Sequence, residues 1–205
     1  MSTNNFLFFQ KDNSFVKQAL NESVQSFQVR NGENLAITLL LFDGKLNLIV
    51  NLEDEFASCD IKVLYLASKS DSIDIKITTN HIKSNTNSSQ IVKGITTDKA
   101  KVNFHGKIYI APDAQKSDGY QNHRALLLSD KTEIQSIPEL EIYADDVKCA
   151  HGSATGPLEK DAVFYLMSRG ISERNAKKIL IHSFINDIIP VTYQPLCDDW
   201  IEQNV

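Results

Sequence analysis

Apolar side chains recur at every second position in a series of short runs between residues 35 and 142. Leu35, Ile37, Leu39 and Leu41 show the pattern most clearly, and polar clusters separate each run from the next. Period-two alternation is typical of β-strands that turn one face toward a core. The sequence therefore predicts a body of short strands. The other runs cover residues 46–50, 61–63, 73–77, 102–104, 108–110, 126–128 and 140–142.

The turns leave two β architectures open. Asp43-Gly44 is the one clear signal for a tight hairpin. Eight glycines and five prolines are few for a Greek-key sandwich, which has many tight turns. Short strands at similar spacing also fit a parallel β-helix, in which successive coils stack on one another. No literal repeat is present, so the period alone does not decide between the sandwich and the solenoid.

The pattern becomes helical after Pro157. Pro157 suits a helix start, and Gly170 is placed to end this helix. Ser172 is a good N-cap for a second helix, which we expect to reach Pro190. Residues 195–203 predict a short third helix. The sequence thus predicts an N-terminal segment over 1–30, a β body over 31–156 and a helical domain over 157–205.

Composition and charge argue against several classes of protein. With 205 residues, of which 42% are hydrophobic and 23% charged, the chain has the character of one globular domain, with or without an appendage. A net charge of -5 argues against nucleic acid as the main partner. No run reaches the ~18 apolar residues of a membrane span. Met1 to Gln10 does not resemble a signal peptide. Three widely spaced cysteines predict a reducing compartment, so we expect a cytoplasmic protein.

Cys149 and His151 are the residues most suited to binding a metal. If residues 147–151 form a strand, the two side chains point to the same side. A thiolate and an imidazole make a ligand pair for iron, zinc or a sulfur-bound species. Two ligands do not complete a metal site, so a partner, a second segment or a small molecule must supply the rest. The alternative is a half-buried cysteine beside a hydrogen-bonded histidine.

The sequence has no convincing arrangement of catalytic residues. Ser117, Asp118 and His123 have the residue types of a nucleophile triad, but they lie within one short run that predicts a structural turn. The stretch 152–156 resembles half of a phosphate loop and lacks the lysine that binds phosphate. No paired carboxylates stand out as a general acid and base. We therefore predict that the chain is not an enzyme. The remaining histidines, His81, His105 and His182, are isolated and are interpreted as packed or solvated side chains.

The two main helices each have an apolar face. This face either packs on the β body or docks a partner, and the pattern leaves both readings open. The residues on it include Val163, Leu166, Ile179, Leu180 and Phe184.

Three segments resemble the SufB/SufD family of the SUF iron–sulfur cluster assembly system. They are AQKSDGYQNHRALLLSD over 114–130, PELEIYADDVKCAHGSATG over 138–156 and DAVFYLMSRGISERNAKKIL over 161–180. Within the family, KCAHGSATG is similar to the SufD version. The strand-rich stretch before residue 106 fits the same family loosely.

The resemblance implies a fold and a function. The fold is a right-handed parallel β-helix followed by a helical domain, in a mainly β protein. The function is that of a non-catalytic scaffold subunit, which pairs with a SufB-like subunit through the β-helix and docks the SufC ATPase through the C-terminal helices. Cys149 and His151 then lie near the SufB interface and hold iron or a nascent cluster transiently, with no stably bound cofactor. The five residues on the helical face become candidates for SufC docking.

Two other functions stay open. One is a homodimeric family member that carries a cluster, with Cys149 as a ligand. The other is a carbohydrate-acting enzyme of the β-helix type, which needs acidic residues or arginines clustered on one face. Before the helical domain the arginines are Arg124 in the predicted β body and Arg30 directly before it, which argues against the enzyme.

Overall fold

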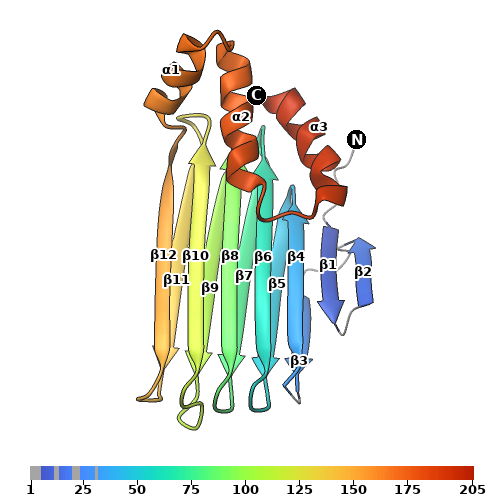
Figure 1. Ribbon diagram of the computed structural model, residues 1–205, viewed down its shortest axis with the longest axis vertical. Coiled ribbons are helices and arrows are strands. Elements are labelled where there is room, and N and C mark those ends of the chain that lie inside the picture. The colour runs from blue at the N-terminus through green and yellow to red at the C-terminus, as the bar shows by residue number, and fades with distance from the viewer. Residues whose placement is uncertain (1–5, 12–13, 20–23, 31) are drawn as a thin grey trace.

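The computed structural model describes residues 6–11, 14–19, 24–30 and 32–205, with side chains from residue 24 onward. Two sheets stand face to face, and from β3 onward successive strands of the chain belong alternately to one sheet and the other (Figure 1). One sheet has the order β12-β10-β8-β6-β4-β1-β2, and the other has the order β11-β9-β7-β5-β3. The strands are β1 (Phe6–Lys11), β2 (Ser14–Ala19), β3 (Val24–Val29), β4 (Asn34–Leu41), β5 (Gly44–Leu52), β6 (Ser58–Ala67), β7 (Ser72–His81), β8 (Asn87–Thr96), β9 (Lys101–Ile110), β10 (Asp118–Leu127), β11 (Glu133–Ile142) and β12 (Lys148–Pro157).

Parallel pairing between strands of successive coils identifies the fold as a β-helix. Ser58 pairs with Asn87, which pairs with Asp118, which pairs with Lys148. From β3 onward each coil adds one strand to each sheet, so consecutive strands lie in different sheets. The tight hairpin indicated by Asp43-Gly44 is therefore wrong, because β4 and β5 on either side of it do not pair with each other. The mainly β prediction is confirmed, and the solenoid is the correct alternative. The β1–β2 pair is antiparallel and extends the first sheet beyond β4.

Sequence periodicity missed some strands. β8 was missed because its inward side chains include the polar Ser88 and Gln90, which break the apolar alternation. β10 begins at Asp118, well before the apolar run predicted at 126–128. The strands also begin earlier in the chain than the alternation indicates. β1, β2 and β3 all lie before residue 30, in the predicted N-terminal segment.

The core changes from apolar to polar along the solenoid axis. In β4 and β6 the inward positions are apolar apart from the hydroxyl of Tyr65, and most of those in β8, β10 and β12 are polar or glycine. Each inward row follows the register of paired strands from the first coil to the last. Read from β4 through β6, β8 and β10 to β12, the rows are Leu35, Cys59, Ser88, Gly119, Cys149; Ile37, Ile61, Gln90, Gln121, His151; Leu39, Val63, Val92, His123, Ser153; and Leu41, Tyr65, Gly94, Ala125, Thr155.

The helices follow the last strand as predicted. They are α1 (Lys160–Ser168), α2 (Glu173–Ile185) and α3 (Gln194–Asn204), with a 3-10 turn at Val191–Tyr193. The Ser172 hydroxyl caps α2 by accepting a hydrogen bond from the Asn175 backbone N–H. Gly170 adopts a φ of 87°, which permits the turn after α1. α2 ends at Ile185, earlier than Pro190, because the chain there turns to bury Ile188 and Ile189.

The inner faces of α2 and α3 pack on the outer face of the first sheet. Ile181 and Ile185 of α2 and Trp200 of α3 share one apolar cluster with Leu64 and Ile95 of the sheet. α1 lies beyond the ends of β12 and β10 and contributes no fully buried residue (Figure 1). Packing on the β body is therefore the role of the inner helical faces. None of the helices in the described ranges has the length and apolarity that a membrane crossing requires.

Candidate functional site

The last coil forms an open end of the solenoid. β12 is the final strand of its sheet and β11 is the final strand of the other. Among the strands that the structure describes, β12 pairs only with β10, and β11 pairs only with β9. Their other edges present backbone N–H and C=O groups that another chain can pair with. This end also carries the most polar part of the core.

Cys149 and His151 lie on the inward side of β12, at this open end. The β10–β12 register places Cys149 beside Gly119 and His151 beside Gln121, which are inward positions of β10. Cys149 is half-buried and packs against an apolar cluster that includes Ile108, whereas His151 is exposed. Burial raises the pKa of the Cys149 thiol, and a hydrogen bond with the Gly119 backbone acts in the opposite direction. A thiolate therefore forms here more readily with a metal or a cationic partner nearby.

The donors present suit iron or zinc but do not complete a coordination shell. Thiolate sulfur and imidazole nitrogen bind both metals. In the described part of the chain, no group of three His, Cys, Asp or Glu side chains is arranged to hold a metal ion. Cys149 and His151 alone therefore do not complete a metal site, and a metal held by them would need further ligands from a partner, a second segment or a small molecule.

A polar chain runs behind these two residues into the solenoid. His123 Nε2 lies 2.9 Å from the Tyr65 hydroxyl, and its Nδ1 lies 2.9 Å from Ser136 Oγ. Ser136 in turn contacts Ser153 of β12, at 2.9 Å between the two Oγ atoms. Burial lowers the pKa of His123 to about 4, so the ring is neutral at physiological pH. Sequence reasoning missed this role and placed His123 in a turn.

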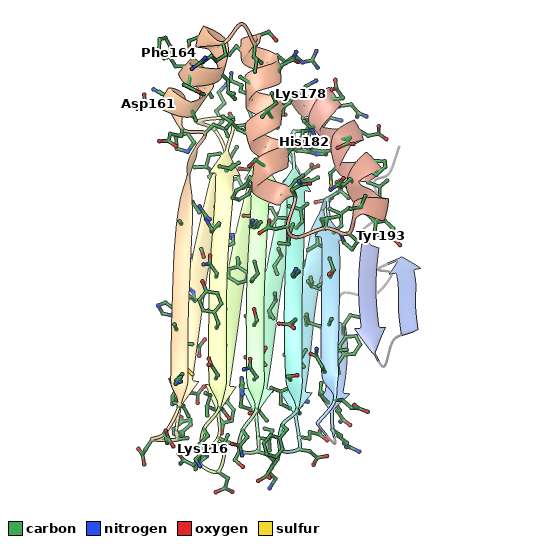
Figure 2. The ribbon with its side chains drawn as sticks, in the orientation of Figure 1. Lys116, Asp161, Phe164, Lys178, His182 and Tyr193 are labelled. Carbon is green, nitrogen blue, oxygen red and sulfur yellow. The ribbon has the colours of Figure 1, made fainter. Side chains whose placement is uncertain are left out.

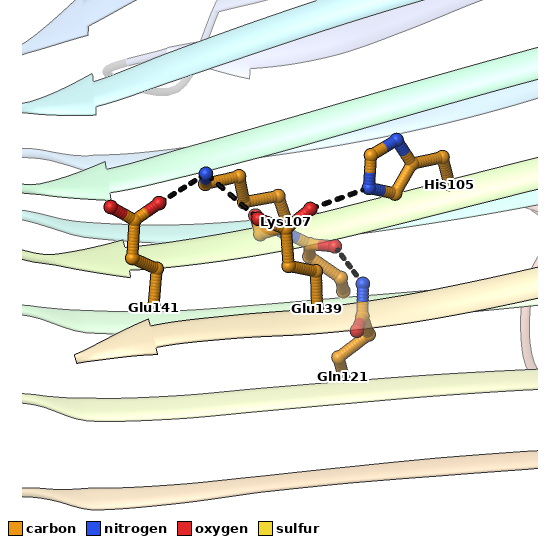
Figure 3. A network of polar contacts seen from close by, with 6 residues as sticks. His105, Lys107, Gln121, Glu139 and Glu141 are labelled. Carbon is orange, nitrogen blue, oxygen red and sulfur yellow. Dashed lines mark hydrogen bonds and ion pairs between the residues drawn. The ribbon is translucent and has the colours of Figure 1, made fainter.

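An ion-pair network crosses the outer face of the other sheet. Lys107 of β9 bonds both Glu139 and Glu141 of β11, and His105 Nε2 lies 2.7 Å from Glu139 Oε2 (Figure 3). Hydrogen bonds with these two carboxylates raise the pKa of Lys107, and Lys107 lowers the pKa of each carboxylate. His105 is therefore part of a network. These charges hold β11 to β9 beside the open end.

The other chemical motifs are structural. Ser117 Oγ bonds Thr86 Oγ1, away from His123, so the triad residues are not brought together. The stretch 152–156 lies within β12 and is not a loop. His81 is buried between Thr86 and Ser88. His182 of α2 lies at the exposed surface, 3.5 Å from Asp198.

The predicted docking residues differ in accessibility. Ile179 is 46% exposed, and Val163 lines a cavity of about 500 Å³ between α1, α2 and the end of β10. Leu166 and Leu180 are half-buried. Phe184 packs against the cluster shared with the sheet, and the Lys93 ammonium lies over its ring.

Exposed aromatic residues on α1 were missed. Phe164 is 72% exposed and Tyr165 is 56% exposed, at the end of the molecule opposite the turn that contains Lys116 (Figure 2). They lie off the apolar stripe through Val163 and Leu166, so a search for a single stripe does not find them. Two adjacent exposed aromatic residues are themselves a signal for a contact surface.

Comparisons with known proteins agree with this architecture. A sequence model of the family described as "SUF system FeS cluster assembly, SufBD core domain" matches residues 9–184. The chain is 35% identical over 159 residues to the iron–sulfur cluster assembly protein SufD of Escherichia coli, an alignment that covers 78% of this chain and 37% of that protein. It is 42% identical over 113 residues to an iron–sulfur cluster assembly SufBD family protein of Synechocystis, covering 55% of this chain and 24% of the relative. The chain thus aligns with about a quarter to little more than a third of the length of these relatives. It belongs to the SufBD family of SUF-system iron–sulfur cluster assembly proteins.

Proposed function

We propose that this chain is a non-catalytic scaffold subunit for iron–sulfur cluster assembly. It pairs with a SufB-like subunit through the open end of the solenoid and docks a SufC-type ATPase through its helices, in the cytoplasm. Iron or the nascent cluster is cargo held transiently between subunits. The observation that carries the proposal is the position of Cys149 and His151, an incomplete ligand pair on the last, uncovered coil.

The open end has the properties of a pairing surface. Its strand edges have backbone groups available for hydrogen bonds. Large apolar side chains are exposed around it, including Ile137 at 46%, Ile142 at 39% and Tyr143 at 58%. A partner that covers this surface brings its own ligands next to Cys149 and His151. The incomplete ligand pair and the surface suited to a partner thus lie at the same place in the molecule.

The helical end supports docking of a separate protein. α1 has no fully buried residue, and Phe164 and Tyr165 project from it. Cys149 lies near the first residue of β12 and α1 follows its last residue, and the ten residues of this strand span roughly 30 Å at about 3.3 Å per residue. A partner at Cys149 and a second partner at α1 therefore contact opposite ends of β12.

Substitution of His151 tests the scaffold role. His151→Ala and Cys149→Ser each remove one ligand while leaving the backbone pairing of β12 intact. We expect iron and sulfide content of the reconstituted complex to fall about 10-fold or more, because an incomplete shell loses metal affinity steeply. The melting temperature of the isolated chain should change little, since His151 is exposed.

His182→Ala is the matched control, because His182 is an accessible histidine far from the open end. It should leave cluster content unchanged. Normal cluster content in the His151→Ala complex would exclude the ligand role. Cluster bound at full occupancy by the isolated chain as a dimer would instead support the homodimeric carrier.

A further inference from the structure

Gln121 has a buried acceptor with no partner. Its side chain is 0% exposed, and its Oε1 atom makes no hydrogen bond within the described residues. Its Nε2 atom donates to Gln90 Oε1 at 2.9 Å. A buried polar atom of this kind is unfavourable unless something supplies a donor. The amide oxygen of Gln121 is therefore a place where a donor is expected.

The orientation of this amide follows from its neighbours. Gln90 Nε2 lies 3.1 Å from the Lys107 backbone carbonyl, which can only accept a hydrogen bond. Gln90 must therefore present its nitrogen to Lys107 and its oxygen to Gln121. Gln121 must in turn present its nitrogen to Gln90, and its oxygen is left on the side away from that contact (Figure 3).

The space for this arrangement is provided by a glycine. A Cβ atom at Gly106 of β9 would lie 1.7 Å from Gln121 Nε2. The absence of a side chain at Gly106 lets the Gln121 amide cross the interior to its present position. The glycine and the two amides together fix one acceptor at the last buried layer of the core.

His151 is the donor nearest to this acceptor in the strand register. It pairs with Gln121 between β12 and β10, on the same inward side, where parallel strands lie about 4.8 Å apart. Its side chain is exposed. Rotation of an exposed side chain is not hindered by packing, so the ring can turn toward Gln121.

Other polar groups of the inward rows are already occupied. Both ring nitrogens of His123 are bonded, to Tyr65 and Ser136. Ser153 of β12 also bonds Ser136. Gly119 and Ala125, the remaining inward positions of β10, carry no polar side-chain atom. Among the inward side chains of β10, Gln121 thus has an unbonded acceptor, its Oε1 atom, next to β12.

We propose that Gln121 is a positioning residue for His151. Its Oε1 accepts a hydrogen bond from one imidazole N–H, which fixes the tautomer and leaves the other ring nitrogen free as a ligand. Histidines that bind metals usually donate their second nitrogen in this way. The inference rests on the proposed function for its purpose, but the hydrogen bond itself is a property of the isolated chain.

The contact is tested by NMR on the full chain labelled with ¹⁵N. The imidazole signals of His151 are assigned by their loss in His151→Ala. In the native chain we expect one predominant neutral tautomer and a nuclear Overhauser effect from its N–H proton to the Gln121 side chain. Gln121→Met, which removes the acceptor at similar volume, should return the ring to the tautomer ratio of a solvated histidine.

A second pair of variants supplies the matched control. Gln121→Glu keeps an acceptor oxygen at this position, so the preferred tautomer of His151 and its nuclear Overhauser effect to residue 121 should persist. Asn122→Met removes an amide on the outward side of β10, where Asn122 donates to the Tyr120 hydroxyl, and should leave the tautomer of His151 unchanged. Equal loss of the tautomer preference in Gln121→Met and Asn122→Met would overturn the proposal. So would a native His151 with a solvated tautomer ratio and no contact with Gln121, whether or not any variant folds.

Cluster assembly separates this inference from the function on which it rests. If both hold, Gln121→Met lowers iron affinity of the assembled complex about 10- to 100-fold. If His151→Ala leaves assembly unchanged, the ligand role fails, and the NMR result still decides whether Gln121 holds the ring.

Discussion

The Tyr65 hydroxyl lies 2.9 Å from His123 Nε2, although the residues are 58 positions apart and belong to strands that do not pair. β8 stands between them, and its inward residue in the row of Tyr65 is Gly94, whereas His123 lies in the neighbouring row. A Cβ atom at Gly94 would lie 1.8 Å from Tyr65 Cζ. The missing side chain thus lets one coil reach across the next. The apolar early coils and the polar last coils are joined through this contact.

Gly94→Ala should destabilise the protein by about 1–3 kcal/mol, because the added methyl group overlaps the Tyr65 ring in a packed core. Urea unfolding measures the loss. Gly156→Ala is the control, since nothing lies within 4 Å of a Cβ atom at that position, and it should stay within about 0.5 kcal/mol of the native chain. Equal stability of the two variants would show that the core near Tyr65 is not tightly packed.

The two buried histidines should make folding sensitive to mild acid. Burial lowers the pKa of both His81 and His123 from 6.5 to about 4. Between these values the unfolded chain binds more protons than the folded chain, so the free energy of unfolding decreases as pH falls from 6.5 to 4. Each histidine contributes about 2–3 kcal/mol to this decrease.

Urea titrations at a series of pH values test the histidine effect. His123→Gln should reduce the slope between pH 6.5 and 5.5, a window that lies above most of the titration of glutamate and aspartate side chains. His182→Gln, at a half-buried histidine on the helical surface, is the control for the substitution itself. A native slope that is flat in this window would contradict the neutral, buried state of both rings.

Cys149 should be the one thiol that reacts in the folded chain. Cys59 and Cys197 are buried, and burial raises the pKa of each to about 12. Cys149 is half-buried with a raised pKa, so it should react with iodoacetamide more slowly than free cysteine but faster than the other two. Mass spectrometry of peptides after timed alkylation gives the order. Labelling of Cys59 first would show that the first coils open more easily than the last.

The exposed residues of α1 and α2 should carry ATPase docking. Phe164→Ser and Ile179→Ser remove apolar surface without disturbing the cluster that α2 and α3 share with the sheet. Retention of a SufC-type ATPase on the immobilised chain should fall about 10-fold for the double variant, as expected when residues central to an interface are removed. Val191→Ser is the control, since Val191 is 76% exposed outside α1 and α2.

These substitutions are better suited to the question than deletion of the helices. Removal of residues 158–205 would uncover Leu64 and Ile95, which the helices bury, and the β body would lose part of its own packing. Unchanged retention of the ATPase by the Phe164→Ser and Ile179→Ser double variant would exclude this surface.

Periodicity predicted the strands whose inward rows are apolar and failed where they are not. Ile73, Ile75 and Ile77 of β7 alternate with polar residues and were found, whereas Ser88 and Gln90 of β8 were missed. The helix caps at Gly170 and Ser172 were recognisable because capping depends on local chemistry.

The candidate site was only partly predictable. Cys149 and His151 are two residues apart, so their shared side follows from strand geometry alone. The partners behind them come from other coils, and no local pattern reveals them. Gln121 precedes His151 by one full coil. Two coils from Tyr65 lead to Ala125, two residues after His123, so the contact between Tyr65 and His123 joins neighbouring rows. These relations emerge only once the coils are stacked in register.

The stacking of coils also determines which changes of chain length the molecule tolerates. Side-chain contacts between successive coils join residues 29 or 31 positions apart, as in the pairs Asn51 with Asn80 and Gln90 with Gln121. If one whole coil were lost, the strands on either side of it could pair directly, with the same direction and the same inward and outward side chains. Loss of a single residue within β10 would turn Asn122 inward in place of Gln121 and reverse every following side chain of that strand. Length in this molecule should therefore vary between relatives in steps of a coil, with smaller changes confined to the turns.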